Sequence, residues 1–262
     1  RIALPIDQSS LASSAEQTLT SRTDILDRES ISLLLQKNVP PLEGKFIHVC
    51  VVRSGLDSDT FVANLLISMY GRYGLVEEAC YVFDHMPHRT MVSWSAMISV
   101  CSKHSQSHTA LSLYKEMIQW GFQPNNVVFV SVLTACASQK SLIEGMLVHV
   151  CIIEGVFEDD VGVANALVNM YSKCGSIDQA FFAYDLMLRD DIFVCPNGRT
   201  FLPLIKACIF AKDLKRGLPI HVQCVLSRWF ERDHFVASAI VEMYAKCGWI
   251  LEAQNVFDIL PD

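Results

Sequence analysis

Apolar residues recur at helical spacing in three nearly identical stretches of the chain. They are LLISMYGRYGLVEEA at Leu65–Ala79, ALVNMYSKCGSIDQA at Ala166–Ala180 and AIVEMYAKCGWILEA at Ala239–Ala253. In each stretch, apolar residues three and four positions apart mark one face of a helix, a glycine permits a turn, and a second amphipathic run follows. The pattern predicts a pair of short helices, an αα-hairpin, at each stretch.

Helices of roughly a dozen residues are marginally stable alone and need neighbours that cover their apolar faces. Stacked hairpins meet this need, and a period of about 30–36 residues is typical of such a solenoid. A second marker, G-x-x-x-H, recurs at Gly44–His48, Gly145–His149 and Gly217–His221, at intervals of 101 and 72 residues. The first marker recurs at 101 and 73 residues. The two markers therefore predict an all-α fold, an α-solenoid of stacked hairpins.

The 101-residue interval divides into hairpins of 31, 35 and 35 residues. Over an array that extends from 25 to 262, we expect hairpins at 25–59, 60–90, 91–125, 126–160, 161–191, 198–233 and 234–262. The second interval is shorter because only IFVCPN, residues 192–197, stands where the first interval has a whole hairpin. We interpret 192–197 as the remnant of a deleted repeat, lost from the gene or skipped in the transcript model, and we expect altered stacking there.

Composition and charge narrow the classes of function. The chain is 51% hydrophobic, yet its longest apolar run, at Val127–Ala137, is about half of the roughly 18–20 residues that a membrane span needs. We therefore expect no membrane partner. The formal charge of −7 argues against a protein that holds nucleic acid mainly by neutralising phosphates. Residues 1–24 are rich in Ser and Thr, which indicates a flexible leader or the remnant of a transit peptide.

Cysteines and histidines do not form a chemical site in the sequence. The ten cysteines include no C-x-x-C pair and recur at equivalent repeat positions, which indicates reduced residues in helix packing. His48, His149 and His221 also share one repeat position, and residues two apart on a helix point in different directions, so H-V-C at 48–50 does not favour a metal. No glycine-rich phosphate loop is present. We expect no metal, no cofactor and no catalytic residue.

The repeat phrases carry a resemblance to a known family. The 31/35/35 alternation, with NLLISMYGRYG, VSWSAMI…GFQPN, VFVSVLTACAS…GMLVH, NALVNMYSKCGSIDQA and FLPLIKAC…GLPIH, resembles the PLS class of plant pentatricopeptide repeat (PPR) proteins. The resemblance covers about nine-tenths of the chain, from Ile25 to Asp262. It implies a right-handed superhelix of PPR repeats that binds single-stranded organellar RNA, one base per repeat.

The resemblance also implies a role. PLS proteins act in mitochondria or chloroplasts, and the class goes with C-to-U RNA editing more than with RNA stability or splicing. The chain would then be the target-recognition part of an editing factor, with accessory proteins of the editing complex as further partners. Many members end in a zinc-dependent cytidine deaminase with H-x-E and C-x-x-C elements. Neither element occurs in this sequence, so we expect no enzyme in this chain; a deaminase would lie beyond it.

The family reads each base with the fifth and the last residue of a repeat. Ser or Thr at the fifth position goes with purines and Asn with pyrimidines; a final Asn favours A or C, and a final Asp favours G or U. Carried over, the readers are Asn64 with Thr90, Ser95 with Asn125, Asn165 with Asp191, and Ser238, whose range ends with the chain. The resemblance implies A for the second pair, U for the third and a weak pyrimidine for the first, where Thr90 departs from the pattern.

The second residue of a repeat acts in the family as an apolar wedge between bases. Phe61, Val92 and Phe235 fit that role, whereas Gly162 does not. The competing hypothesis is a protein-binding α-solenoid scaffold similar to tetratricopeptide repeats. Readers that line one groove, exposed and regularly spaced, would favour RNA; burial in hairpin contacts would favour the scaffold. The uncapped last repeat also predicts self-association.

Overall fold

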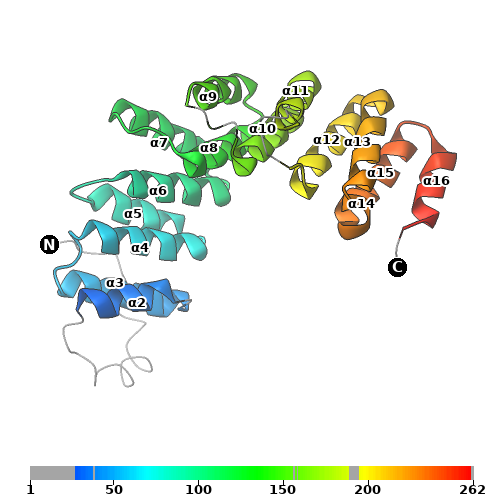
Figure 1. The fold of residues 1–262 in the computed structure, drawn as a ribbon. Coiled ribbons are helices and arrows are strands. Elements are labelled where there is room, and N and C mark those ends of the chain that lie inside the picture. Colours follow the sequence, from blue (N-terminus) through cyan, green and yellow to red (C-terminus); the bar gives the residue numbers. More distant parts are fainter. Residues whose placement is uncertain (1–26, 38, 156, 158, 189–194, 261–262) are drawn as a thin grey trace. The chain divides into compact units, whose positions relative to one another are not determined.

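The computed structural model describes residues 27–37, 39–155, 157, 159–188 and 195–260, which form fifteen helices and no strand (Figure 1). Consecutive helices pair into hairpins, so the predicted α-solenoid fold is confirmed. The helices fall into two compact units, one that extends to Val100 and one that begins at Cys101. Among the described residues, no helix is both long and apolar enough to cross a membrane.

The first unit stacks two hairpins and the start of a third. Its core lies between α2 and α4, which pack on each other, while α3 and α5 each pack on α4. Phe83 of α5 meets Trp94 of α6 edge to face, with ring centroids 5.0 Å apart, and both side chains are fully buried. The helices are α2 (Arg28–Gln36), α3 (Pro41–Arg53), α4 (Thr60–Arg72), α5 (Val76–His85) and α6 (Met91–Lys103), the last as far as Val100.

The second unit continues the same plan. In every hairpin from α8 onward the second helix packs on the first, and the first helices α8, α10, α12 and α15 pack side by side in a row. The row continues from α10 to α12, so these two first helices are direct neighbours where the sequence period predicts a further hairpin. The helices are α7 (Ser107–Gln119), α8 (Asn126–Gln139), α9 (Leu142–Glu154), α10 (Val161–Lys173), α11 (Ile177–Met187), α12 (Gly198–Ala211), α13 (Leu214–Leu226), α14 (Trp229–Arg232), α15 (His234–Lys246) and α16 (Ile250–Asp258).

The two sequence markers face each other in the folded chain. The histidine of each G-x-x-x-H bonds to the tyrosine of the next M-Y phrase, at Nδ1–Oη distances of 2.8, 2.8 and 3.0 Å. The glycine of each marker faces the methionine of the same phrase, and a Cβ there would overlap the methionine sulfur. The markers recur together because they form one interface between a second helix and the next first helix. The pairs are His48–Tyr70, His149–Tyr171 and His221–Tyr244, with Gly44–Met69, Gly145–Met170 and Gly217–Met243.

Polar residues define where the first helices begin. Each N-cap side chain accepts a hydrogen bond from a backbone N–H of the first turn, which satisfies a donor that the helix leaves unpaired. These caps are Asp27, Asp59, Asn125, Asp160, Asn197 and Asp233. At α6, Thr90 Oγ1 accepts from Ser93 N at 3.4 Å. The ten cysteines are free thiols, and the described residues contain no group of His, Cys, Asp or Glu able to hold a metal.

Candidate functional site

An open hollow of about 660 Å³ lies over the N-terminal turns of α4 and α6 and the start of α2, within the first unit. Apolar side chains, one side-chain amide and one ion pair line it. Its lining residues are Arg28, Asp59, Thr60, Phe61, Asn64, Leu65, Ser68 and Val92.

The walls of the hollow are apolar side chains that the fold leaves in solvent. Phe61 of α4 is 46% exposed and Val92 of α6 is 62% exposed, at the same position of consecutive first helices. Phe235 occupies this position on α15 in the second unit and is 77% exposed, whereas Gly162 on α10 has no side chain to offer. Exposed aromatic and branched side chains at a regular position are suited to stack against flat ligand rings.

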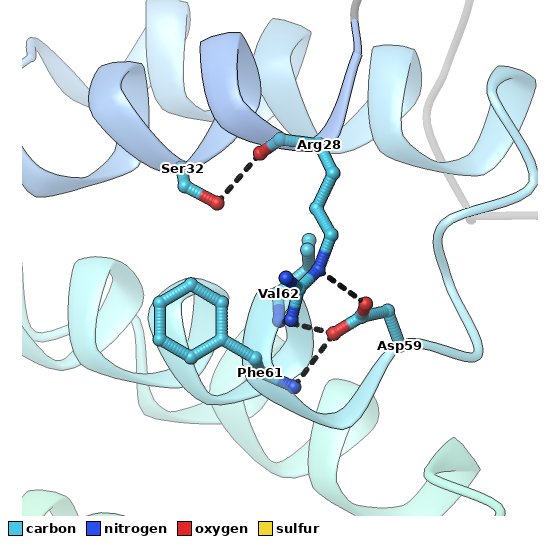
Figure 2. A network of polar contacts seen from close by, with 5 residues as sticks. All are labelled: Arg28, Ser32, Asp59, Phe61 and Val62. Atoms are coloured by element: carbon cyan, nitrogen blue, oxygen red, sulfur yellow. Dashed lines mark hydrogen bonds and ion pairs between the residues drawn. The ribbon is translucent and has the colours of Figure 1, made fainter.

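Two of the lining residues, Arg28 and Asp59, form an ion pair, which Figure 2 shows. Arg28 Nε donates to Asp59 Oδ2 at 2.7 Å, and the Arg28 guanidinium lies 5.1 Å from the centroid of the Phe61 ring. Asp59 Oδ1 accepts from the backbone N–H groups of Phe61 and Val62 at 2.8 and 3.1 Å. Partial burial opposes ionisation of Asp59, but the hydrogen bonds from Arg28 and from the two amides lower its pKa overall. The hollow therefore keeps a carboxylate and a guanidinium beside its aromatic wall.

Asn64 supplies an unsatisfied acceptor in the hollow. Its side chain is half-buried, and its Oδ1 is fully buried with no hydrogen-bond partner among the described residues. A buried acceptor without a donor costs about 1–3 kcal/mol. This oxygen has no exposed surface in the structure, so a ligand N–H would meet it only after the Asn64 amide turns toward the hollow.

The expectation that the fifth-position readers are exposed is wrong for two of them, and burial of Asn165 in a contact between hairpins is the outcome that favours the scaffold at that position. Ser95 is 9% exposed and Asn165 is 8% exposed, while Asn64 is half-buried and Ser238 is exposed. Ser95 is short enough to fold back on its own helix, and its Oγ donates to the Met91 carbonyl at 2.8 Å. Asn165 is covered because α10 packs on α12, where Thr200 Oγ1 donates to Asn165 Oδ1 at 2.5 Å.

The last-position readers lie at helix starts. Thr90 is exposed and Asn125 is half-buried, and Asn125 Oδ1 accepts from Val128 N at 3.0 Å as the cap of α8. The remaining residue predicted for this role, Asp191, lies outside the described residues.

The structure adds a fifth-position residue that the sequence analysis missed. Because Asp27 caps α2, that helix begins at Arg28, three residues after the start of the range 25–59, and Ser32 is its fifth residue. Ser32 Oγ donates to the Arg28 carbonyl at 2.6 Å, as Ser95 does to Met91 (Figure 2). The available signal was an aspartate directly before an amphipathic run, which is a helix start.

A basic residue ends or caps the C-terminus of every described first helix. Cations are favoured there because the last carbonyls of a helix carry partial negative charge. All of these side chains are exposed, so a chain of net charge −7 still places one positive group per hairpin at the same end of its first helices. They are Lys37, Arg72, Lys103, Lys140, Lys173, Lys212 and Lys246.

Comparison with known proteins identifies the repeats. Residues 61–90 and 163–192 match the model of the PPR repeat, and residues 89–138 match that of the PPR repeat family. These segments are pentatricopeptide repeats.

Relatives carry the same repeats. The chloroplastic pentatricopeptide repeat-containing protein At5g55740 of Arabidopsis thaliana is 31% identical over 245 residues, which are 82% of this chain and 29% of that protein. The mitochondrial protein At3g09040 of the same plant is 30% identical over 251 residues, 84% of this chain and 24% of that protein. The chain thus spans less than a third of the length of these relatives.

A solved structure shares the fold. The pentatricopeptide repeat protein PPR10, crystallised with an 18-nt psaJ RNA element, superposes with a TM-score of 0.75 at 18% identity. The superposition covers 92% of this chain and 36% of that protein.

Proposed function

We propose that this chain of pentatricopeptide repeats binds single-stranded RNA along the row of its first helices, one base per hairpin. The observation that carries the proposal is the hollow of the first unit, which exposed Phe61 and Val92 line together with Asn64. A base unstacked from a single strand can lie against Phe61 and present its edge to Asn64. The RNA complex of PPR10, a protein of the same fold, agrees with this proposal.

The chemistry of the hollow favours a pyrimidine at Asn64. Cytosine offers an exocyclic amino group and uracil offers N3–H, and either is a donor for Asn64 Oδ1 once the amide turns to face the hollow. Stacking supplies affinity without choosing among bases, because every base has a flat face. In this proposal Phe61 and Val92 hold the base, and Asn64 selects its class.

The net charge of −7 leaves the chain few positive groups with which to bind RNA phosphates. Phosphates would meet the exposed basic residues at the ends of the first helices, one per hairpin, rather than a continuous basic surface. Such contacts give a salt-dependent term of modest size. The affinity then depends on the base contacts.

We extend the proposal to the predicted repeat ranges and their reader pairs. The helices α4, α6, α8, α10, α12 and α15 begin at the first residues of their ranges, which supports this register. Within the first unit, Ser32 with Asp59 becomes an additional pair. Phe61, Val92 and Phe235 are the wedges, and their exposure supports that role.

We further propose that the chain serves an organellar RNA-processing factor of the PLS class that specifies a C-to-U editing site. The 31/35/35 alternation supports the class, and relatives named chloroplastic or mitochondrial support an organelle. Accessory proteins of an editing complex are its further partners.

A matched pair of phenylalanines tests the RNA proposal. Phe61 on first helix α4 and Phe46 on second helix α3 are 46% and 41% exposed within the same unit. Fluorescence anisotropy should show that Phe61→Ala weakens binding of short single-stranded RNAs about tenfold, since stacking is worth about 1–3 kcal/mol per base. Phe46→Ala should bind as the wild type does, and an RNA duplex should compete poorly. Equal effects of the two substitutions, or no preference for single strands, would favour the protein-binding scaffold.

A further inference from the structure

Arg28 is the one basic residue among the described residues that line the hollow of the first unit. It is the first residue of α2, whereas the basic residues proposed above to meet RNA phosphates lie at the C-terminal ends of the first helices. Arg28 lines the same hollow as Phe61 and Asn64, and its side chain is 56% exposed. It is therefore placed to meet the same ligand as these two residues.

The ion pair with Asp59 leaves most of the Arg28 donors available. A guanidinium has five N–H donors in one plane, and Arg28 bonds to Asp59 Oδ2 with the one on Nε, at 2.7 Å (Figure 2). Within the part of the chain that the structure describes, Nη1 and Nη2 make no hydrogen bond. Four N–H groups can therefore bind a ligand that carries acceptor oxygens.

Asp59 does not cancel the positive charge at this place. Its Oδ1 accepts from the backbone N–H groups of Phe61 and Val62, in the first turn of α4. The N-terminus of a helix carries partial positive charge, so the carboxylate is shared between that charge and the guanidinium. The group formed by Arg28, Asp59 and the start of α4 keeps a positive balance, which favours an anion.

An equivalent contact in the second unit shows that capping does not need an arginine. Asn126, the first residue of α8, donates from Nδ2 to Oδ2 of Asp160 at 2.9 Å. Asp160 caps α10 as Asp59 caps α4, and its Oδ1 accepts from Val163 N at 2.9 Å. A neutral amide thus holds the carboxylate oxygen that Arg28 holds in the first unit. The charge and the further donors of Arg28 are not needed for the cap.

We propose that Arg28 binds a phosphate of the nucleotide whose base stacks on Phe61. Arginine N–H groups form charge-assisted hydrogen bonds with phosphate oxygens. The guanidinium lies 5.1 Å from the centroid of the Phe61 ring, which remains 46% exposed, so base and phosphate can be held side by side. This inference rests on the proposed RNA function. It adds a backbone contact that positions the base before Asn64 without choosing its class.

Arg28→Asn tests the inference, because it keeps an amide that can bond to Asp59, as Asn126 does to Asp160, and removes the charge. Fluorescence anisotropy with single-stranded RNAs between about 50 and 200 mM salt would give affinity and salt dependence. Arg28→Asn should bind all sequences about fivefold more weakly at the lower salt concentration, as expected for a partly exposed charge pair. The slope of log affinity against log salt should fall by about 0.7, the value for one phosphate of a single strand.

Matched variants and neutral linkages locate the contact. Arg53→Asn, at an exposed arginine in the last turn of second helix α3, should bind as the wild type does. Arg28→Lys, which keeps the charge, should retain the salt slope of wild type. RNAs in which one phosphate at a time is an uncharged methylphosphonate should bind wild type about fivefold more weakly at the linkage that Arg28 contacts. At that linkage Arg28→Asn should show no further loss.

The outcomes separate this inference from the function on which it rests. Unchanged affinity and salt slope in Arg28→Asn would overturn it, as would tighter binding, which would mean that the guanidinium competes with bases for Phe61. If Arg28→Asn melts below the assay temperature, Arg28→Gln, with a longer amide, serves the same comparison. Where Phe61-dependent binding persists without an effect of Arg28, the RNA proposal stands. Absence of RNA binding by the wild type would overturn both.

Discussion

Acidification should weaken the fold through His48, which lies in one of the three histidine–tyrosine pairs between hairpins. Its ring is 5% exposed, and its Nδ1 shares a hydrogen bond of 2.8 Å with Tyr70 Oη. Burial lowers the pKa of His48 from 6.5 to about 4, against a small opposing effect of Asp57. Burial also raises the pKa of Tyr70. The pair is therefore neutral in the folded chain at neutral pH.

The sign and size of the effect follow from linkage. A histidine whose pKa is lower in the folded state than in the unfolded state binds a proton more readily when the chain is unfolded. Its contribution to the unfolding free energy is therefore complete above pH 6.5 and is lost as the pH falls towards 4. At about pH 5 the unfolded histidine is almost fully protonated, whereas folded His48 is about nine-tenths neutral. The unfolding free energy should then be about 2 kcal/mol lower than at neutral pH from this residue alone.

Urea unfolding at about pH 7.5 and pH 5 would measure the effect in wild type, His48→Gln and the control His88→Gln, which alters an exposed histidine of the same unit. Wild type and His88→Gln should lose about 2 kcal/mol more than His48→Gln between the two pH values. His149 and His221 titrate equally in all three proteins, so the difference isolates His48. A difference below about 0.5 kcal/mol would refute the reasoning, because it would mean that burial does not keep His48 neutral.

Two further substitutions test the packing and the caps. Gly71→Ala places a Cβ against Cγ2 of Val100, a stiff β-branched side chain, and should lower the unfolding free energy by about 1–3 kcal/mol. Adding Val100→Ala to the same chain should restore part of that loss, as measured by thermal melts. If the effects of the two substitutions simply add, there is no clash between the two side chains. Asp160→Ala removes the cap of α10 and the 2.9 Å hydrogen bond from Asn126, and should lower the unfolding free energy by about 1–2 kcal/mol. The control Asp159→Ala, at an exposed neighbouring residue, should lower it by less than about 0.5 kcal/mol. Equal melting temperatures of the two variants would contradict the capping role.

The two repeated sequence markers predicted the hairpins, but not which side chains contact each other between one hairpin and the next. G-x-x-x-H and M-Y recur at matching intervals, so the repeat and its stacking follow from periodicity. That Gly44 faces Met69 and His48 bonds Tyr70 depends on which helices become neighbours, and the sequence period carries no such information.

The sequence predicted part of the candidate site, but not where every helix begins or which side chains are buried. The residues predicted to be wedges, Phe61, Val92 and Phe235, are exposed, as that prediction requires. Burial of Ser95 and Asn165 was missed because it depends on the path of a short side chain and on contact with Thr200, which lies 35 residues away. Ser32 was missed because the predicted range 25–59 begins three residues before α2, which starts at Arg28.

Asn197 was missed as a cap for a related reason. The sequence period ends the preceding repeat at Asp191, whereas the residue that caps α12 is Asn197, six residues later. The repeat count along the chain is interrupted at residues 192–197, whereas capping depends only on residues at the start of α12.

Thr90 offers the most direct test of base reading, because its contact as a cap and its predicted role as a reader can be separated. It lies at the start of α6, within the unit that holds Asn64, and Asp, Asn and Thr are all effective caps. Thr90→Asn and Thr90→Asp should therefore fold with similar stability. Their RNA preferences should differ, since the first adds a donor and the second only acceptors.

The measurement is the affinity of wild type and both variants for single-stranded RNAs that carry one C or one U at each position in turn. The account predicts a weak pyrimidine preference for wild type, a preference for C in Thr90→Asn and for U in Thr90→Asp, each about tenfold and at the same position of the strand. Identical preferences in three equally stable proteins would contradict the claim that these hairpins read bases one by one.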